Sequence, residues 1–361
     1  MPLVKVQSRG TENVGEGNSN VIINGGMQVS QRATSTTSTG YQTLDRFQFL
    51  ANNTDQFAFT VAQSTTVPDG FANSLKVDCT TAETSLDADE LVRVLYKIEG
   101  QDIQNFAYGT SASEIVTLSF YVRSNITGVF TIEFRLNGSG TSTITKQYTI
   151  SSADTWERKI ITLPTNTVTA ITNDNSNGME ISFCLSAGSN FTTGSLGTTW
   201  ATTATASRYS GQVGNIMSSN SNEWLLTGVQ LEVGEQPSDF QFESFGETLS
   251  KCQRYFFKIN GTGSEYATMG AGQMYQTTSF LGYLKAPVPM RSRPSFSLSD
   301  SFSNANFAVV TGGHVRAISS LTLTGDNQYF RVNAVVSGAT QGHGGYIQIQ
   351  SGYNAFFSSE L

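Results

Sequence analysis

The stretch "EWLLTGVQLEVGEQPSDFQFESFGETLSKCQRYFFK", residues 223–258, decides the fold because its pattern changes twice. It begins with apolar and polar residues in alternation, which is typical of a β-strand, and Gly228 marks a change of register. Pro237 ends that strand, because proline cannot donate a backbone hydrogen bond to a central ladder. Ser244 then precedes a short amphipathic segment and is suited to cap a helix. The stretch therefore predicts a last core strand, a joint and a short helix.

Five aromatic residues follow the proline and lie where we expect a domain boundary. A flexible linker would be polar and rich in Gly and Ser, whereas this one is aromatic. We therefore predict a packed inter-domain joint over residues 237–256. Its aromatic residues are Phe240, Phe242, Phe245, Tyr255 and Phe256.

Short strands precede and follow the joint. Upstream, "EIVTLSFYVRSN" and "GVFTIEFRLNG" alternate with a period of two, and several similar segments recur at short spacing. This pattern indicates an all-β protein, with a jelly-roll β-sandwich over residues 21–236. A second, smaller β-sandwich is expected over residues 257–361, and the polar residues 1–20 are expected to form an N-terminal arm.

Composition and charge exclude several classes of protein. The chain has 361 residues and a net charge of −7. Residues 1–245 carry 13 Lys/Arg against 23 Asp/Glu, and residues 246–361 carry 8 against 5. Neither part is strongly basic, so we expect no nucleic-acid binding. No apolar run is long enough to span a membrane, so we expect no membrane insertion.

The stretch from Gly188 to Asn222 is rich in Gly, Ser, Thr and Ala, and a loop of this length is usually functional or packs on its own side chains. Trp200 and Tyr209 are its large aromatic residues, and an exposed aromatic ring can stack on a sugar. They are therefore the glycan-contact candidates, although both could equally anchor the loop.

Metal sites have little support in the sequence. Asp87, Asp89 and Glu90 cluster, and Asp45 and Asp78 could join them around a structural calcium ion. The spacing matches no dedicated calcium loop, so a solvated acidic turn is the favoured interpretation and no cofactor is predicted. The three cysteines, at positions 79, 184 and 252, are far apart, and we expect them to be free thiols.

No catalytic motif is visible. The two histidines, His314 and His343, lie in glycine-rich turns away from any nucleophile elbow. Two carboxylates placed for glycoside cleavage cannot be identified from sequence alone. We therefore predict no catalytic residues and no enzyme activity.

Several segments resemble, in order, a group of bacteriophage virion appendage proteins, mostly tail fibres. They include "NVIINGGMQVSQRATS", "TLDRFQF", "LYKIEGQDIQNFAYG", "YTISSADTWERKIITLP", the stretch at 223–258 and "YNAFFSSEL". The family's "QRG" reads Gln31-Arg32-Ala33 here, and its "TPFE" reads Ser238-Asp239-Phe240-Gln241. The resemblance implies a first domain similar to carbohydrate-binding jelly rolls, but a fold does not fix a function.

The resemblance implies a virion protein, assembled in the host cytoplasm, that acts as a non-catalytic tail-fibre adhesin. Its partners would be other virion proteins, through the arm, and a host-surface glycan. A homotrimer is expected from the family, and repeated weak sites would sum to strong attachment. One alternative is a capsid decoration, cement or tail-collar protein without a receptor. The other is a polysaccharide depolymerase.

Overall fold

The computed structural model describes residues 20–53, 56–202, 204–261, 266–299 and 306–361. These residues form two compact units. Unit 1 comprises the described residues up to Met27 together with Phe49–Phe242, and unit 2 comprises Gln28–Gln48 together with Glu243–Leu361. The predicted N-terminal arm, apart from Asn20, lies outside the described residues.

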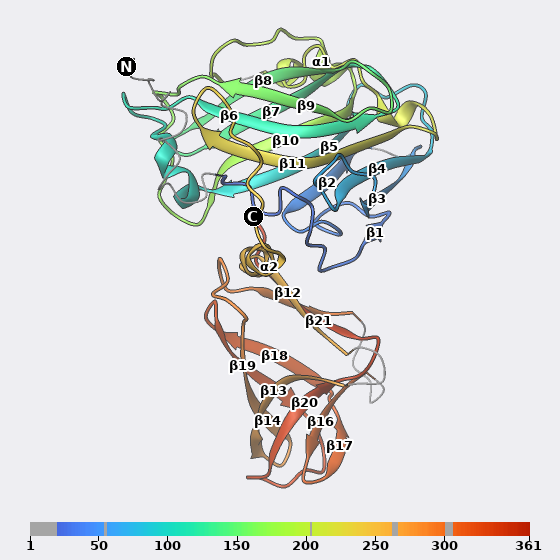
Figure 1. Ribbon diagram of the computed structural model, residues 1–361. Helices are drawn as coiled ribbons and strands as arrows, with labels where there is room; N and C mark the ends of the chain where they lie inside the picture. Colours follow the sequence, from blue (N-terminus) through green and yellow to red (C-terminus); the bar gives the residue numbers. More distant parts are fainter. Residues whose placement is uncertain (1–19, 54–55, 203, 262–265, 300–305) are drawn as a thin grey trace, which may run out of the picture. The chain divides into compact units, whose positions relative to one another are not determined.

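Unit 1 is built from two antiparallel sheets (Figure 1). Sheet A places side by side, in this order, β3 (Ala58–Ser64), β4 (Ser74–Thr81), β11 (Glu223–Val233), β6 (Val116–Ser124) and β9 (Glu157–Leu163). Sheet B has the order β2 (Phe47–Asn52), β5 (Leu91–Glu99), β10 (Asn177–Ala187), β7 (Gly128–Asn137) and β8 (Thr141–Ile150). Strands adjacent in a sheet are mostly distant in sequence, as in a jelly roll.

Aromatic side chains join the two sheets of unit 1. Phe120 of β6 lies 5.3 Å from Phe183 of β10, with the rings edge to face. Phe183 also contacts Trp224 of β11, and the Trp224 indole donates a 3.2 Å hydrogen bond to the Tyr148 hydroxyl of β8. All four side chains are buried, so the inward faces of both sheets form one core.

The register change predicted at Gly228 in unit 1 is confirmed. The register of β11 against β6 shifts between Thr227 and Gln230, and Gly228 within the shift has a φ of +61°. Glycine adopts that conformation without strain, which is why the bulge forms there. The 3₁₀ helix η2 (Gly100–Phe106) follows β5 directly.

Unit 2 is a smaller β-sandwich. Sheet C has the order β12 (Phe256–Asn260), β21 (Asn354–Ser358) and β15 (Ser295–Leu298). Sheet D has the order β17 (His314–Ala317), β16 (Phe307–Thr311), β20 (Gly344–Ile349), β13 (Ala267–Gln276), β14 (Ser279–Lys285), β19 (Tyr329–Val335) and β18 (Ser320–Gly325).

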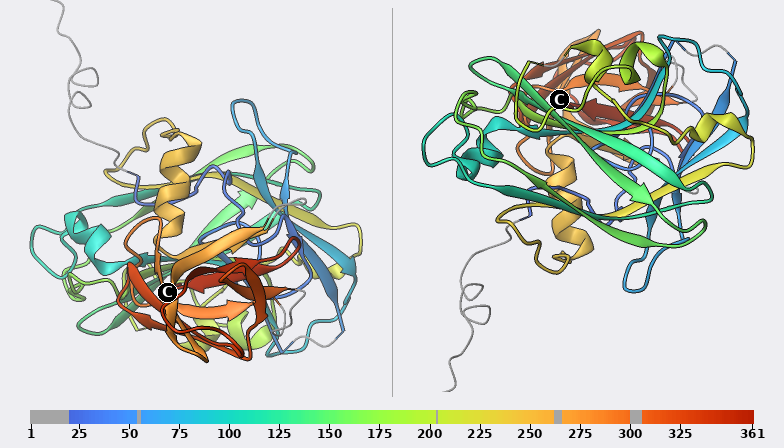
Figure 2. Two further views of the ribbon diagram at one scale, coloured as in Figure 1. Left: turned by 90° about the horizontal axis from the view of Figure 1, so that it is seen from below. Right: turned by 90° about the horizontal axis from the view of Figure 1, so that it is seen from above.

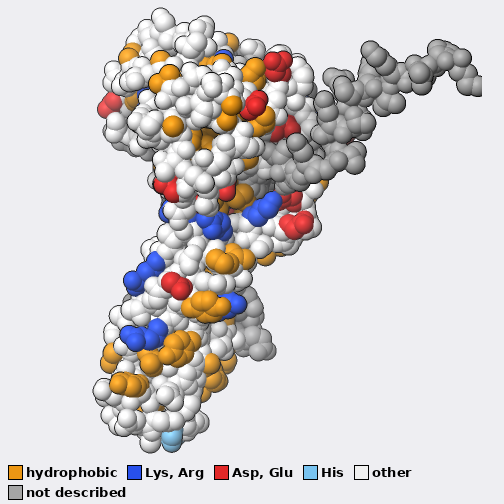
Figure 3. Space-filling view, turned by 90° about the vertical axis from the view of Figure 1, so that its left-hand side faces the viewer, with side chains coloured by type: hydrophobic (Ala, Val, Ile, Leu, Met, Phe, Trp, Pro, Cys, Tyr) orange, Lys and Arg blue, Asp and Glu red, His pale blue; other side chains and the backbone are white. Residues whose placement is uncertain are grey.

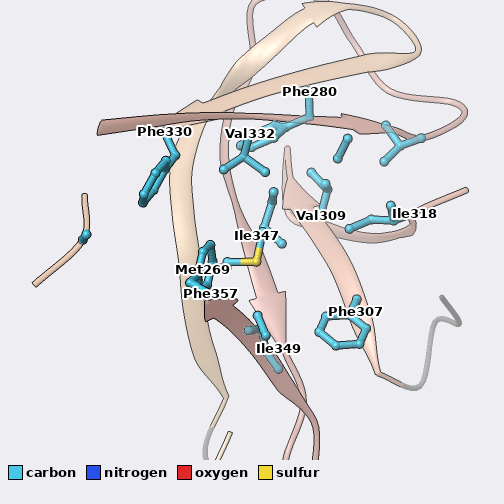
Figure 4. Close-up of a cluster of buried hydrophobic side chains, with 14 of the residues drawn as sticks. Met269, Phe280, Phe307, Val309, Ile318, Phe330, Val332, Ile347, Ile349 and Phe357 are labelled. Carbon is cyan, nitrogen blue, oxygen red and sulfur yellow. The ribbon is translucent and has the colours of Figure 1, made fainter. Parts of the chain in front are cut away.

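The core of unit 2 lies between these two sheets (Figure 4). Phe357 of sheet C stacks on Phe257 at 4.4 Å and lies 5.9 Å from Phe330 of sheet D. Met269 and Phe280, both fully buried, line the inner side of sheet D. The predicted fold class, a jelly-roll sandwich followed by a smaller β-sandwich, is confirmed.

The predicted helix is α2 (Phe245–Gln253), and Ser244 is its N-cap. Ser244 and Glu247 form a capping box, in which each side chain pairs with the backbone of the other residue. Thr248 and Cys252 are the buried side chains of the helix. Within the described residues, no helix is both long and apolar enough to cross a membrane.

The Gln28–Gln48 segment, which contains β1 (Ser35–Thr36), belongs to unit 2, a grouping that strand periodicity did not predict. Arginine side chains attach it to the C-terminal residues of the unit. The guanidinium of Arg46 lies 3.5 Å above the Tyr255 ring, and that of Arg32 lies 3.6 Å above Phe256. Both arginines pair with Glu360, at 2.6 Å from Arg46 and 3.2 Å from Arg32.

The five aromatic residues of the predicted joint are divided between the units. Phe240 and Phe242 contact each other and the ring of Phe71 in unit 1, at 4.9–5.2 Å. Tyr255 and Phe256 are buried in unit 2, whereas more than half of the Phe245 side chain is exposed. The packed inter-domain joint stays a prediction.

Candidate functional site

The outer face of sheet B carries polar and charged side chains, in contrast to its inner face. Side chains alternate between the two faces of a strand, so Tyr96 and Phe183 point into the core while their neighbours point outward. Four neighbouring strands of sheet B, in the order β5, β10, β7 and β8, contribute outward positions. They are Arg93, Leu95 and Lys97 of β5; Glu180, Ser182 and Cys184 of β10; Thr131, Glu133 and Arg135 of β7; and Thr143, Thr145 and Gln147 of β8.

Three charged residues form a row across this face. Glu180 pairs in register with Lys97 on one side and with Arg135 on the other. All three side chains are half-buried. The Asn177 amide donates a 2.6 Å hydrogen bond to the Glu180 carboxylate and so restrains it. The row thus presents donors and acceptors on strands, which hold side chains more precisely than loops do.

The loop from Gly188 to Asn222 covers the neighbouring part of the face. It contains α1 (Ser189–Thr192), η3 (Thr205–Ser207) and η4 (Ile216–Ser218), and it is drawn in yellow-green in Figures 1 and 2. Arg208 forms two hydrogen bonds with the Glu133 carboxylate, at 2.6 and 2.8 Å. Ala201 adds an antiparallel bridge to Thr143 of the edge strand β8. The loop is therefore anchored to β7 and β8 and borders the charged row.

Tyr209 lies beneath this loop and not on its surface. The side chain is fully buried and packs with Leu91 and Cys184. Its hydroxyl lies 2.8 Å from that of Ser182, and burial raises the pKa of Tyr209 to about 12. The glycan-contact prediction for Tyr209 is therefore corrected: a ring with no exposed face cannot stack on a sugar, so this residue is an anchor.

Trp200 is half-buried at the edge of the same loop. Its indole donates a 2.8 Å hydrogen bond to the Pro164 carbonyl, and its ring lies edge to face with Tyr108 at 5.7 Å. Pro164 follows β9 of sheet A, while Ala201, the next residue after Trp200, pairs with β8 of sheet B. Trp200 thus packs across the edge of the sandwich, and its part in glycan contact stays a prediction.

The acidic residues considered for calcium do not converge. Asp45 belongs to unit 2 and accepts hydrogen bonds from Gln31, while Glu90 is buried and accepts one from the backbone of Asp87. Lys76 pairs with Asp78 at 3.4 Å. Among the described residues, no three His, Cys, Asp or Glu side chains are grouped to hold a metal ion. The three cysteines are all buried thiols.

Unit 2 contains a pocket of about 290 Å³ beside Arg32. Its walls include Phe256 and Phe356, whose rings stack at 6.1 Å. The cation at this pocket is already paired with Glu360 and stacked on an aromatic ring. The pocket thus lies beside the contacts that hold the Gln28–Gln48 segment in place.

The charged row was not identified from the sequence, although its residues stand in the alternating pattern. Lys97, Glu180 and Arg135 occupy outward positions of three strands that are not consecutive in the chain. Alternation assigns each to a face, but only the order β5-β10-β7 brings them side by side. The row can exchange hydrogen bonds with a hydroxyl-rich ligand, because it combines cationic donors with a carboxylate acceptor.

No protein-family model and no curated protein matches the chain. Among solved structures, it is similar to the enzymatically active domain of tailspike protein 4 of bacteriophage CBA120, at 13% identity and a TM-score of 0.33, over 60% of this chain and 22% of that one. It is also similar to a family 11 carbohydrate-binding module of Clostridium thermocellum, at 10% identity and a TM-score of 0.29, over 55% of this chain and 95% of that one. A family 22 carbohydrate-binding module of Clostridium thermocellum Xyn10B is similar at 12% identity and a TM-score of 0.31, over 62% of this chain and 99% of that one. At these TM-scores the likenesses assign no family, ligand or activity to this chain.

Proposed function

We propose that the chain is a non-catalytic glycan-binding protein of a bacteriophage virion and that it attaches the particle to polysaccharide on the host surface. One observation carries the glycan-binding part of this proposal: the Lys97–Glu180–Arg135 row on the outer face of sheet B. Polar side chains held rigidly on a sheet recognise sugar hydroxyls at low entropic cost, because little ordering is needed on binding.

The positions and contacts of Glu133 and Glu180 on this face support a binding role over catalysis. Glycoside cleavage needs a carboxylic acid that holds a proton beside a second carboxylate. Here Arg208 binds both oxygens of Glu133, and Glu180 lies between Lys97 and Arg135. Both oxygens of Glu133 are thus occupied by Arg208, so this carboxylate is not free to act on a glycosidic bond.

The virion role has its basis in the sequence resemblance. The motif residues hold the Gln28–Gln48 segment within unit 2. Gln31 donates a hydrogen bond to Asp45, and Arg32 and Arg46 stack on aromatic rings of the same unit. Docking through residues 1–20 and trimer formation are parts of the same proposal. Three copies would multiply a weak site into strong attachment.

The test is binding of the purified chain to an array of bacterial surface polysaccharides. We expect retention on at least one glycan, and a loss of about tenfold or more in Arg135→Met, since a hydrogen bond to a charged group contributes about 1.5–3 kcal/mol. Arg158→Met, an exposed cation on β9 of the other sheet, is the control and should bind as the wild type does.

Three outcomes would overturn parts of the proposal. Equal binding by the Arg135→Met variant and the wild type would move the site away from the row. Release of reducing ends from the bound polysaccharide would replace the non-catalytic role with depolymerase activity. Failure of the purified protein to compete with phage adsorption on a strain whose polysaccharide it binds would separate glycan binding from host attachment.

A further inference from the structure

The outer face of sheet D carries exposed aromatic side chains, and the site proposed here is independent of the one in unit 1. One row of outward residues crosses all seven strands in register. Adjacent members pair in the order Val315, Val310, Tyr346, Ala271, Tyr283, Arg331 and Thr324.

The tyrosines of this face are exposed. The exposed fractions are 65% for Tyr283, 57% for Tyr329 and 38% for Tyr346. Tyr283 and Tyr346 are separated by one intervening strand, which places their backbones about 10 Å apart. Exposed aromatic rings at that spacing offer stacking surfaces to successive parts of an extended ligand.

Cations lie among these rings. Arg331 pairs in register with Tyr283, and the Lys285 ammonium lies 5.4 Å from the Tyr329 ring centroid. The seven strands of sheet D contain no Asp or Glu. Figure 3 shows hydrophobic and cationic side chains lying among one another on the surface of the C-terminal strands, where acidic side chains are scarce.

We propose that this face, named here the tyrosine–cation face and defined by Tyr283, Lys285, Tyr329, Arg331 and Tyr346, binds an anionic polysaccharide. The rings would stack on the apolar faces of the sugars, and Lys285 and Arg331 would pair with carboxylate or phosphate groups along the polymer. The charge complementarity is what selects the ligand: strands that carry Lys285 and Arg331 but no Asp or Glu attract a polyanion and gain nothing electrostatic from a neutral glycan.

A two-fold contact between two copies of this chain fits the face less well. In a two-fold contact the same surface meets itself, so Lys285 and Arg331 would face the cations of the other copy. Like charges brought together at an interface cost several kcal/mol. The face is also too sparsely charged for nucleic acid, which is held by many phosphate contacts.

The experiment is isothermal titration of the full chain with polygalacturonate, with a polyglycerol-phosphate teichoic acid and with neutral dextran. We expect at least one polyanion to bind, dextran to bind at least tenfold more weakly, and affinity to fall when NaCl is raised from about 50 to about 300 mM. The two polyanions distinguish a carboxylate ligand from a phosphate ligand. Arg331→Met and Tyr283→Ala should each weaken binding about tenfold.

Two control variants make the result specific. Lys251→Met removes a cation from α2 of the same unit and should leave binding unchanged. Arg135→Met disables the row proposed in unit 1 and should also leave polyanion binding unchanged, so the two proposals fail separately.

The proposal is overturned if all three polymers bind equally, if none binds, or if Arg331→Met and Tyr283→Ala bind like the wild type. Single-stranded DNA that bound as tightly as polygalacturonate would show a nucleic-acid surface instead. Light scattering completes the test: an oligomer that dissociates in the Tyr283→Ala variant would assign the face to self-association.

Discussion

The guanidinium of Arg46 lies 3.5 Å from the centroid of the Tyr255 ring, although the two residues are far apart in the chain. Both are almost completely buried, and Arg46 also pairs with Glu360 at 2.6 Å. Stacking and ion pairing together compensate for the desolvation of a buried cation.

Replacing Arg46 should destabilise unit 2 strongly. Arg46→Met keeps an apolar stem but leaves Glu360 with one arginine fewer, and breaking a buried pair typically costs about 3–5 kcal/mol. Denaturant unfolding followed by tyrosine fluorescence should show an earlier transition. Arg331→Met is the control, because that arginine is exposed and its loss should change stability by no more than about 0.5 kcal/mol. Equal midpoints for the two variants would contradict the anchoring role of Arg46.

Glu223 should make the stability of unit 1 depend on pH in the acidic range. Burial acts to raise its pKa, but hydrogen bonds from Lys76 and Arg123 outweigh burial, so the pKa lies below its usual value. A lowered pKa means that the carboxylate stabilises the fold above the ordinary value near 4.5, and that this contribution is lost as the pH falls through the lowered pKa. Glu223→Gln should therefore unfold at a lower temperature than the wild type at about pH 7.

The same comparison at low pH supplies the control. Below the lowered pKa of Glu223, the two proteins carry the same charge at this position, so their melting temperatures should converge. A difference that stayed constant from neutral to acidic pH would mean that the hydrogen bonds, and not the charge, account for the effect.

Trp200→Ala should loosen the edge of the sandwich. The change removes the hydrogen bond to Pro164 and the ring contact with Tyr108, at an expected cost of about 2 kcal/mol. Limited proteolysis should cut the 188–222 loop faster than in the wild type. Trp200→Phe is the matched variant, which keeps a ring but not the hydrogen bond. If glycan affinity fell in the alanine variant while stability did not change, Trp200 would be a ligand contact and not an anchor.

Two glycines should respond in opposite directions to alanine. Gly228 has a φ of +61°, and a Cβ there would lie 2.7 Å from the Phe71 ring, so Gly228→Ala should cost about 2 kcal/mol or more. At Gly246, in helix α2, a Cβ would meet no atom within 4 Å, so Gly246→Ala should stabilise the helix by about 0.5–1 kcal/mol. Thermal unfolding measures both, and a stabilising Gly228→Ala would contradict the bulge.

Local patterns predicted the fold class well. Alternation identified the strands, Ser244 identified the start of α2, and Gly228 identified the bulge in β11. Each of these features depends on residues within a few positions of one another, so a single sequence contains the necessary information.

Features that depend on distant pairing were not predictable in the same way. The burial of Tyr209 results from a loop folding back over sheet B, and the charged row results from the strand order. The attachment of the Gln28–Gln48 segment to Glu360 joins residues more than 300 positions apart. Periodicity carries no signal for such contacts, because it describes faces and not partners.

The Arg46–Glu360 contact spans 314 residues, which also constrains the order of events at the ribosome. At a translation rate of about 5–20 residues per second, roughly 15–60 s separate the synthesis of these two residues. Throughout that interval Glu360 is not yet available to pair with Arg46. Unit 2 is thus completed only after translation has passed Glu360, whereas most strands of unit 1 can already pair on the nascent chain.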